Sequence, residues 1–283
     1  MKVLIAGAAS LVGSHFARRL ERIHDVRGLS HRDLDISDRE AVRRCVSDLK
    51  PAVIVNGAVI QVDECEQNPA KAQAVNVEGP RALAEAAADV RATIIHFSTQ
   101  YAFSGEPVGR APYTIDDDPQ PVNVYGKTKV ASERAVAEAC PQSYIVRTSW
   151  VYGSGKNSFL CTVHNDLFCG RRVHAIDDIW SSTTYVEDLI DRVLEILPTG
   201  RYGIYHIVNE EVCSYYDFAL EAGRLVGLTR NQLEPLIEVV KEAQMKRVAI
   251  RPRYTPMRCL LSEKLGLSPM RDWKSALAAY VKS

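Results

Sequence analysis

The sequence lacks both the cysteine pairs of a disulfide framework or zinc site and an excess of charge of one sign. Its seven cysteines are odd in number and scattered, with no CxxC spacing, which indicates reduced thiols in a cytoplasmic protein. Lys plus Arg and Asp plus Glu are equal at 35 each, so we expect no nucleic-acid partner. Apolar runs such as residues 3–9 have only strand length, and residues 1–2 lead into a strand pattern without a signal peptide. We therefore also expect no membrane partner.

What the sequence does contain is a regular alternation of strand and helix patterns in its first half. Short segments rich in β-branched residues are expected to be strands, at residues 2–7, 25–30, 52–58, 93–99 and 144–150. Several are apolar at consecutive positions, as in strands that are covered on both faces. Helical spacing is found between them, at residues 11–21, 37–50, 70–90 and 125–139. This alternation predicts an α/β fold with a doubly wound parallel Rossmann sheet and ligands at the C-terminal edge of its strands.

In the second half the alternation of strand and helix patterns is less regular, which predicts a smaller lobe packed on the sheet. We expect helices near residues 157–169, 185–197, 214–228 and 272–281, and strands at 171–177 and 203–209. The expected division is a dinucleotide-binding Rossmann domain at residues 1–155, with the strand near 171–177 added to its sheet. Residues 156–283 are expected to form, for the most part, a smaller C-terminal substrate-binding lobe.

The turn after the first strand, GAASLVG, has the glycine spacing of a pyrophosphate-binding loop. Gly7 and Gly13 bracket the turn, and Leu11 and Val12 lie at the helix start, where backbone amides can bind phosphate. Ser10 replaces the middle glycine of the usual motif, and its hydroxyl could donate to a phosphate. The alternative is a tight strand–helix turn that needs glycine for geometry alone. The place of the turn after the first strand favours a dinucleotide.

The end of the second strand bears on which dinucleotide binds. An acidic residue there favours the ribose hydroxyls of NAD, whereas arginine accommodates the phosphate of NADP. This strand ends Ser30-His31-Arg32, which favours NADP(H), with NAD(H) as the alternative cofactor and a solvated basic turn as the structural explanation. Asp35 and Ile36 follow, and they are candidates for flanking the adenine.

A hydroxyl at a strand end and a tyrosine–lysine pair are the candidate catalytic groups. Thr99 ends the fourth expected strand, and Tyr125 and Lys129 follow on one face of the next helix. A cation close to a phenol favours phenolate, so Lys129 is expected to bring the pKa of Tyr125 nearer to neutral. The plain alternative is an exposed i,i+4 pair. A strand-end hydroxyl followed by YxxxK is the arrangement of the short-chain dehydrogenases/reductases.

An ordered set of segments resembles one extended branch of that superfamily, the dTDP-4-dehydrorhamnose reductases. The segments are LDISD (34–38), VDECEQNP (62–69), VNVEGP (75–80), HFSTQYAFSG (96–105), NVYGKTK (123–129), RTSWVYG (147–153), SSTTYVEDL (181–189) and YHIVN (205–209). The resemblance covers nearly the whole chain. It implies an NADPH-dependent oxidoreductase that reduces a nucleotide-activated 4-keto-6-deoxysugar to the 4-hydroxy sugar, in deoxysugar biosynthesis.

The resemblance also implies roles for particular residues. Tyr125 would protonate the carbonyl oxygen while Thr99 donates a hydrogen bond to it, and Lys129 would hold the nicotinamide ribose. Expected dinucleotide contacts, besides the glycine loop and the residues after the second strand, are Gly57, Ala58, Val59, Ser98, Tyr125 and Lys129. Expected substrate contacts are Gln61, Val62, Thr99, Gln100, Tyr101, Phe103, Tyr125, Trp150 and Arg251.

Two of these residues have a structural alternative, and several positions depart from the family pattern, among them the loop at residues 59–61, which lacks the family's aromatic. Trp150 could stack on a base or sugar ring or belong to the core, and Arg251 could bind a diphosphate or be structural. Gln100 stands where the family commonly has aspartate, which leaves the identity of the sugar open. His15 stands where some relatives carry a glutamate for a magnesium-bridged dimer, so no metal is expected.

A function from another class stays open at this point. A regulatory subunit of methionine adenosyltransferase is a structural relative of this branch, and it binds NADP without needing to turn it over. The presence of Thr99, Tyr125 and Lys129 favours the enzyme. The oligomeric state is also open, with a homodimer as one alternative.

Overall fold

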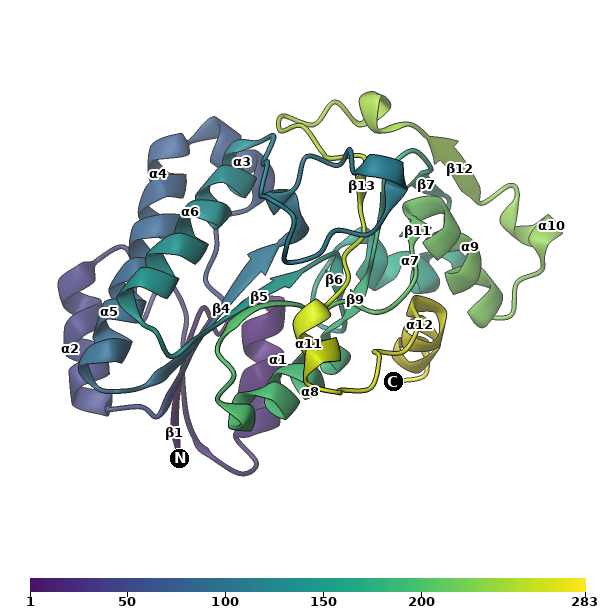
Figure 1. The fold of residues 1–283 in the computed structure, drawn as a ribbon. Coiled ribbons are helices and arrows are strands. Elements are labelled where there is room, and N and C mark those ends of the chain that lie inside the picture. The colour runs from purple at the N-terminus through teal and green to yellow at the C-terminus, as the bar shows by residue number, and fades with distance from the viewer.

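A six-stranded parallel sheet forms the centre of the N-terminal part of the protein (Figure 1). The computed structural model describes residues 1–283, apart from the side chain of Val108, and the strand order is β10-β5-β4-β3-β1-β2. The strands are β1 (Lys2–Ala6), β2 (Asp25–Leu29), β3 (Val53–Asn56), β4 (Thr93–Thr99), β5 (Ser143–Thr148) and β10 (Gly203–His206). The expected α/β fold is confirmed, and β1 to β5 lie where the sequence predicts strands.

Helices cover both faces of this sheet (Figure 1). One face carries α1 (Leu11–Leu20) and α8 (Val186–Ile196), and the other carries α2 (Arg39–Leu49), α5 (Gly79–Asp89) and α6 (Val124–Ala139). Neighbouring residues of β1 therefore enter different cores: Val3 packs in the cluster of Phe16, and Leu4 packs in the cluster of Val42. This arrangement explains why the strand sequences are apolar at consecutive positions.

The strand expected at residues 171–177 forms, but it does not join the central sheet, so this part of the domain prediction is wrong. It is β7 (Val173–Ile176), and it pairs with β12 (Ile237–Val240) in a separate two-stranded sheet. Its His174 is exposed and pairs with Glu238 at 3.1 Å, whereas a strand inside a parallel sheet is covered on both faces. The sixth place is taken by β10, which pairs with β5.

The single helix expected at residues 70–90 is interrupted. It consists of α4 (Pro69–Gln73), a π-helical turn at Ala74–Glu78 and then α5. Pro80 cannot donate a backbone hydrogen bond to the preceding turn, which accounts for a local change of helix type. The π-helical turn points Asn76 into the protein, where its Oδ1 accepts from the amide of Ile60 at 2.8 Å. Asn76 thereby holds the loop after β3.

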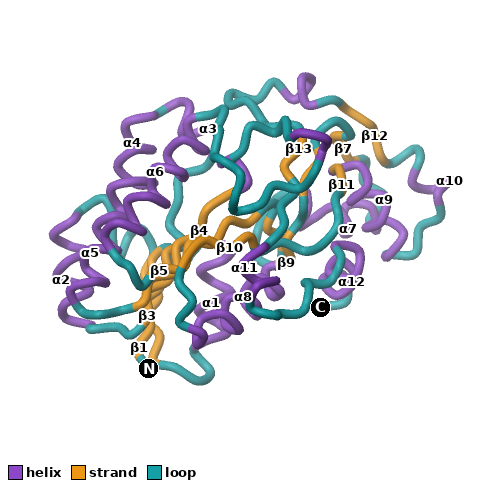
Figure 2. The backbone as a smooth tube through the Cα atoms, in the orientation of Figure 1, coloured by secondary structure: helices purple, strands orange, loops and turns teal.

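The C-terminal part of the chain forms a smaller lobe with more loop than the sheet (Figure 2). Its helices are α7 (Phe159–Phe168), α9 (Tyr215–Leu225), α10 (Arg230–Leu233), α11 (Leu260–Lys264) and α12 (Trp273–Val281). Its other strands are β6 (Val151–Tyr152), β8 (Trp180–Ser181), β9 (Thr184–Tyr185), β11 (Cys213–Ser214) and β13 (Tyr254–Thr255).

Short helices complete the chain: α3 (Val62–Gln67) and the 3₁₀ turns at Gln100–Ala102, Val108–Arg110, Leu197–Thr199 and Glu242–Met245. Within residues 1–283, no helix combines the length and the apolar character needed to cross a bilayer.

Candidate active site

A cleft of about 440 Å³ lies at the C-terminal edge of the central sheet, where the lobe meets it. Its walls come from the turn after β1, the ends of β3, β4 and β5, the starts of α6 and α7, and two residues of the lobe, Tyr215 and Arg247. It brings together the predicted residues Ser10, Leu11, Val12, Gly57, Ala58, Val59, Gln61, Val62, Ser98, Thr99, Gln100, Tyr101, Tyr125, Lys129 and Trp150.

The glycine turn after β1 is closed tightly against the end of β3. Gly7 has a φ of 78°, and a β-carbon there would lie 2.5 Å from the amide nitrogen of Ala58. A β-carbon on Gly13 would lie 2.3 Å from the carbonyl oxygen of Gly7. Ser10 caps α1, because its Oγ accepts from the amide of Gly13 at 3.0 Å. The Ser10 proton stays free to donate to a phosphate at this helix start, so the turn fits a dinucleotide.

The turn after β2 is basic and exposed. His31 and Arg32 are exposed, and Ser30 is tied to Asp33, whose Oδ2 accepts from its amide at 2.9 Å and its hydroxyl at 2.7 Å. These hydrogen bonds lower the pKa of Asp33, the side-chain bond most. The only acidic group of the turn is therefore engaged within it.

The two residues expected to flank an adenine are placed differently from that expectation. Asp35 accepts from the amide and hydroxyl of Ser37 at 2.9 and 2.7 Å. Ile36 is 3% exposed and packs in the core, where a β-carbon on Gly79 would lie 2.7 Å from its Cδ1. The core between α2 and α5 encloses the Ile36 side chain, so only the backbone of this residue is available to flank an adenine.

Tyr125 reaches the cleft from the first turn of α6. Asn123 caps this helix by accepting from the amide of Gly126 at 2.7 Å. A β-carbon on Gly126 would lie 2.2 Å from the carbonyl oxygen of Tyr101, so the glycine lets α6 start directly against the chain that follows β4. This contact sets the Tyr125 hydroxyl beside that of Thr99 in the cleft.

The expected lowering of the Tyr125 pKa by Lys129 is wrong. Burial raises the pKa of Tyr125, and the neighbouring Tyr101 adds to the rise, while the hydrogen bond with Thr99 opposes it. Lys129 is 2% exposed, and burial lowers its own pKa to about 8. Its Nζ lies 3.2 Å from Nε2 of His96. The effect of burial on the pKa of Tyr125 is therefore larger than that of a lysine one helical turn away.

One face of the cleft is aromatic. Trp150 lines the cleft and has the left-handed φ of 42°, a strained backbone conformation for a bulky residue. Its ring centroid lies 4.0 Å from that of Tyr215, which in turn lies 5.6 Å from that of Phe159. Trp150 is half-buried, so it packs against the core and also presents ring surface to the cleft.

Two predicted substrate contacts are not in the cleft. Phe103 is fully buried and stacks on Tyr113, with ring centroids 4.2 Å apart, so it is a core residue. Arg251 donates from Nη2 to Asp63 Oδ2 at 2.8 Å, so its guanidinium is engaged in an ion pair. Neither side chain lines the cleft, because Tyr113 stacks on Phe103, and Asp63, which is distant in sequence, pairs with Arg251.

Two cationic residues that line the cleft in addition to Lys129 were missed by sequence reasoning. They are Lys156, which is exposed just before α7, and Arg247 in the lobe. Arg247 Nη1 lies 3.3 Å from Glu242 Oε2 and leaves the rest of its guanidinium free to face the cleft. No motif marks either residue, and only the folding of the lobe over the sheet edge brings them there.

Among the described residues, no cluster of three or more His, Cys, Asp and Glu side chains could hold a metal. His15 faces Glu187 at 2.6 Å and the carbonyl oxygen of Ser154 at 2.9 Å. This histidine therefore connects α1 to α8 and to the loop before α7.

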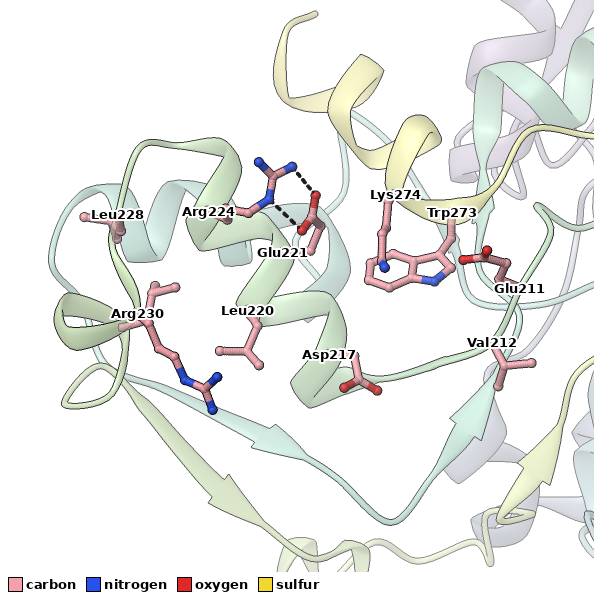
Figure 3. A pocket seen from close by; sticks show the side chains of 11 residues that line it. Glu211, Val212, Asp217, Leu220, Glu221, Arg224, Leu228, Arg230, Trp273 and Lys274 are labelled. Carbon is pink, nitrogen blue, oxygen red and sulfur yellow. Dashed lines mark hydrogen bonds and ion pairs between the residues drawn. The ribbon is translucent and has the colours of Figure 1, made fainter.

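A second cavity of about 430 Å³ lies in the C-terminal lobe, between α9, α10 and the start of α12 (Figure 3). Three of its charged groups, Asp217, Glu221 and Arg224, are engaged locally. Arg224 pairs with Glu221, as Figure 3 shows, and Asp217 accepts from the amide and hydroxyl of Ser214 to cap α9. The predicted cofactor and catalytic residues line the first cleft, and none of them lines this cavity.

A parallel α/β sheet with a glycine turn, a strand-end hydroxyl and a YxxxK pair in one cleft defines an oxidoreductase of the short-chain dehydrogenase/reductase class. Within that class, residues 1–283 match the family model of the RmlD substrate binding domain, and the chain belongs to this family. The family resemblance expected from the sequence is thereby confirmed.

Named relatives lie close to this chain in sequence and structure. It is 38% identical to a dTDP-4-dehydrorhamnose reductase of Mycolicibacterium smegmatis, over 98% of this chain and 84% of that protein. It is 35% identical to a probable dTDP-4,6-dihydroxy-2-methyloxan-3-one 4-ketoreductase of Streptomyces antibioticus, over 98% and 93%. The crystal structure of a Bacillus anthracis dTDP-4-dehydrorhamnose reductase in complex with NADP is similar, with a TM-score of 0.92, 28% identity and coverage of 100% and 99%.

Proposed function

We propose that this protein is an NADPH-dependent reductase that converts a nucleotide-activated 4-keto-6-deoxysugar to the 4-hydroxy sugar. The observation that carries the proposal is the convergence of Thr99, Tyr125 and Lys129 in the cleft beside the glycine turn. The names of the relatives, which describe reductases of dTDP-sugars, support a sugar nucleotide as substrate. The Bacillus anthracis complex supports NADP(H) as cofactor.

The proposed mechanism divides the chemistry between the cofactor and three side chains. NADPH, when bound, supplies the hydride that adds to the carbonyl carbon. Tyr125 donates its phenolic proton to the carbonyl oxygen, and the raised pKa keeps this proton in place at neutral pH. Thr99 donates a hydrogen bond to the same oxygen as negative charge develops. Lys129 pairs with the ribose hydroxyls and stabilises the phenolate that Tyr125 becomes.

The proposed cofactor contacts follow the walls of the cleft. The turn from Gly7 to Gly13 would receive the pyrophosphate at the start of α1. His31 and Arg32 are exposed in the turn after β2, and the guanidinium of Arg32 suits the additional phosphate of NADP. Gly57, Ala58, Val59 and Ser98 would contact the rest of the dinucleotide along the ends of β3 and β4.

The proposed substrate contacts lie on the lobe side of the cleft. Lys156 and Arg247 supply positive charge for the diphosphate, in place of Arg251. The ring faces of Trp150 and Tyr215 suit stacking on the base or the sugar. Gln61, Val62, Gln100 and Tyr101 complete the wall that leads to the catalytic groups.

We also propose the division of labour between the two parts of the chain. Residues 1–155 supply the cofactor turn and the catalytic groups, and residues 156–283 supply most of the substrate lobe, although β10 returns to the central sheet. All seven cysteines are free, which supports a reducing compartment such as the cytoplasm.

Tyr125→Phe tests the proposed mechanism. Removal of the only proton donor to the carbonyl oxygen should lower kcat by about 10²- to 10⁴-fold. The dissociation constant for NADPH should change by less than about twofold, because the ring is retained. The measurement follows the loss of nicotinamide absorbance with a panel of dTDP-4-keto-6-deoxysugars. NADPH binding is measured separately by fluorescence.

Tyr113→Phe is the matched control, since Tyr113 is a buried phenol outside the cleft and should keep its turnover. Wild-type rates in Tyr125→Phe would contradict the assigned role. A wild-type protein that binds NADPH and reduces no sugar of the panel would instead fit the regulatory, NADP-binding alternative.

A further inference from the structure

Three buried polar side chains form a continuous hydrogen-bonded row next to Lys129, and the proposed reaction uses none of them. Asn56 at the end of β3, His96 in β4 and Ser132 in α6 are at most 1% exposed. Asn56 Nδ2 lies 3.1 Å from His96 Nδ1, and Ser132 Oγ lies 2.9 Å from His96 Nε2. Polar groups buried this deeply are expensive to desolvate unless each hydrogen bond is satisfied.

The backbone fixes the direction of the hydrogen bonds in this row. The amide of Ala58 can only donate, so Asn56 Oδ1 accepts from it at 3.2 Å and Asn56 Nδ2 donates to His96 Nδ1. At the other end, Ser132 Oγ donates to the carbonyl oxygen of Lys129 at 2.7 Å and therefore accepts from His96. His96 thus carries its proton on Nε2.

The ring of His96 is also held neutral. Burial, with a smaller effect from Lys129, lowers the pKa of His96 well below its usual range. The row therefore presents one fixed N–H donor, on Nε2, toward α6.

Lys129 meets this fixed donor directly. Its Nζ lies 3.2 Å from His96 Nε2. An ammonium group has donors only and finds no acceptor at this nitrogen, whereas an uncharged amine accepts from it. Glu133 on α6 and Cys65 on α3 act on the charge of the amine, His96 on β4 lies against it, and Tyr125 on α6 lines the same cleft. Burial lowers the pKa of Lys129 to about 8, and the carboxylate of Glu133 opposes that shift.

We propose that His96 is a positioning residue that favours the uncharged amine of Lys129 until the dinucleotide binds. The inference rests on the proposed function, because the ribose oxygens of NADP(H) are the acceptors that stabilise the ammonium form. Where Lys129 holds the free amine, binding then transfers one proton from solvent to its Nζ. Above about pH 8, where the free amine predominates, cofactor binding takes up a proton and weakens as the pH rises.

Two variants test this with opposite expected shifts. His96→Leu removes the N–H donor, so the ammonium forms more readily and the alkaline fall in NADPH affinity moves to higher pH, by about half a unit or more. Ser132→Ala removes the competing acceptor, so Nε2–H donates to Lys129 alone and the fall moves to lower pH. NADPH titration calorimetry above about pH 8, in two buffers of different ionisation enthalpy, measures the proton uptake.

The control is Tyr144→Phe, which removes a buried hydroxyl that donates to the carbonyl oxygen of Ile196 at 3.2 Å, outside the cleft lining. It should leave the pH dependence of NADPH binding unchanged. If His96→Leu does not fold, the inference is tested by the direction in which Ser132→Ala shifts the alkaline fall in NADPH affinity. NADPH binding to the wild type without proton uptake, or shifts of both variants in one direction, would overturn the inference. Absence of NADPH binding altogether would overturn the proposed function instead.

Discussion

The hydroxyl of Thr99 has one proton, and Gln100 Oε1 accepts it at 3.0 Å. The amide of Tyr101 donates to the same hydroxyl at 3.2 Å. Donation from Thr99 to a substrate carbonyl therefore requires this proton to turn away from Gln100. A neutral amide oxygen holds the proton weakly enough for such a turn, whereas a carboxylate in the same place would hold it about twice as strongly.

Gln100→Glu should therefore impair the chemical step. The isosteric carboxylate keeps the proton of Thr99 and places negative charge beside the developing alkoxide, so kcat should fall by about tenfold or more. Steady-state kinetics with the best sugar of the panel measures this loss. Gln142→Glu makes the same charge change at an exposed position and should retain wild-type kcat. Equal kcat values for both variants would show that the residue at position 100 does not restrict hydrogen-bond donation by Thr99.

Local spacing was sufficient to predict the convergence of Thr99, Tyr125 and the glycine turn. Parallel strands end at a common edge, so residues at those ends lie close together however the lobe packs on the sheet. The roles given to Phe103 and Arg251 depended on what packs against them, and their respective partners His206 and Asp63 are distant in sequence. Their burial could not be inferred from pattern alone.

At the scale of elements, the chain from residue 247 to 251 forms a strap between the lobe and the sheet domain. Asp63 in α3 accepts from the amide of Ala249 at 3.0 Å and from Arg251 Nη2 at 2.8 Å. Asn123 at the start of α6 donates to the carbonyl oxygen of Ile250 at 2.8 Å. These contacts hold the segment that carries Arg247 over the cleft.

Asp63→Ala should loosen this strap without altering the cofactor site. We expect KM for the sugar nucleotide to rise by about three- to tenfold, because the strap loses two hydrogen bonds and Arg251 loses its counter-charge. The dissociation constant for NADPH should stay within about twofold. Glu64→Ala is the matched control, since Glu64 pairs with the exposed Lys71. A parallel rise in the NADPH dissociation constant would indicate general disruption of α3.

The features that sequence patterns missed, namely which sheet a strand joins and where a helix changes type, depend on contacts with other parts of the chain. The pattern at residues 171–177 correctly predicted a strand, but sheet membership is decided by β12, which is far along the chain. Likewise, helical spacing at residues 70–90 is correct on average, and the π-helical turn becomes visible only through the contact of Asn76 with Ile60.

At the scale of the whole molecule, a buried polar chain connects the central sheet to its surroundings. Arg147 in β5 donates from Nη2 to Glu133 Oε2 in α6 at 2.7 Å, and its Nη1 lies 3.4 Å from Nε2 of His206 in β10. His206 Nδ1 donates to the carbonyl oxygen of Tyr113 at 3.2 Å. Burial, with the charge of Arg147 as a smaller cause, lowers the pKa of His206 to about 3.

This pKa makes the stability of the fold sensitive to mild acid. Below about pH 6.5 His206 is protonated in the unfolded chain and neutral in the folded protein, so the unfolded state binds more protons. The free energy of unfolding therefore decreases as the pH is lowered. Between about pH 7.5 and 5.5, this one group should remove about 1.4 kcal/mol from the free energy of unfolding. His206→Gln keeps an acceptor for Arg147 but cannot titrate, so urea unfolding should show a correspondingly smaller loss over this interval. His174→Gln removes an exposed histidine and should keep the wild-type pH dependence. Identical slopes for His206→Gln and the wild type would mean that Arg147 tolerates a protonated neighbour, against the geometry described above.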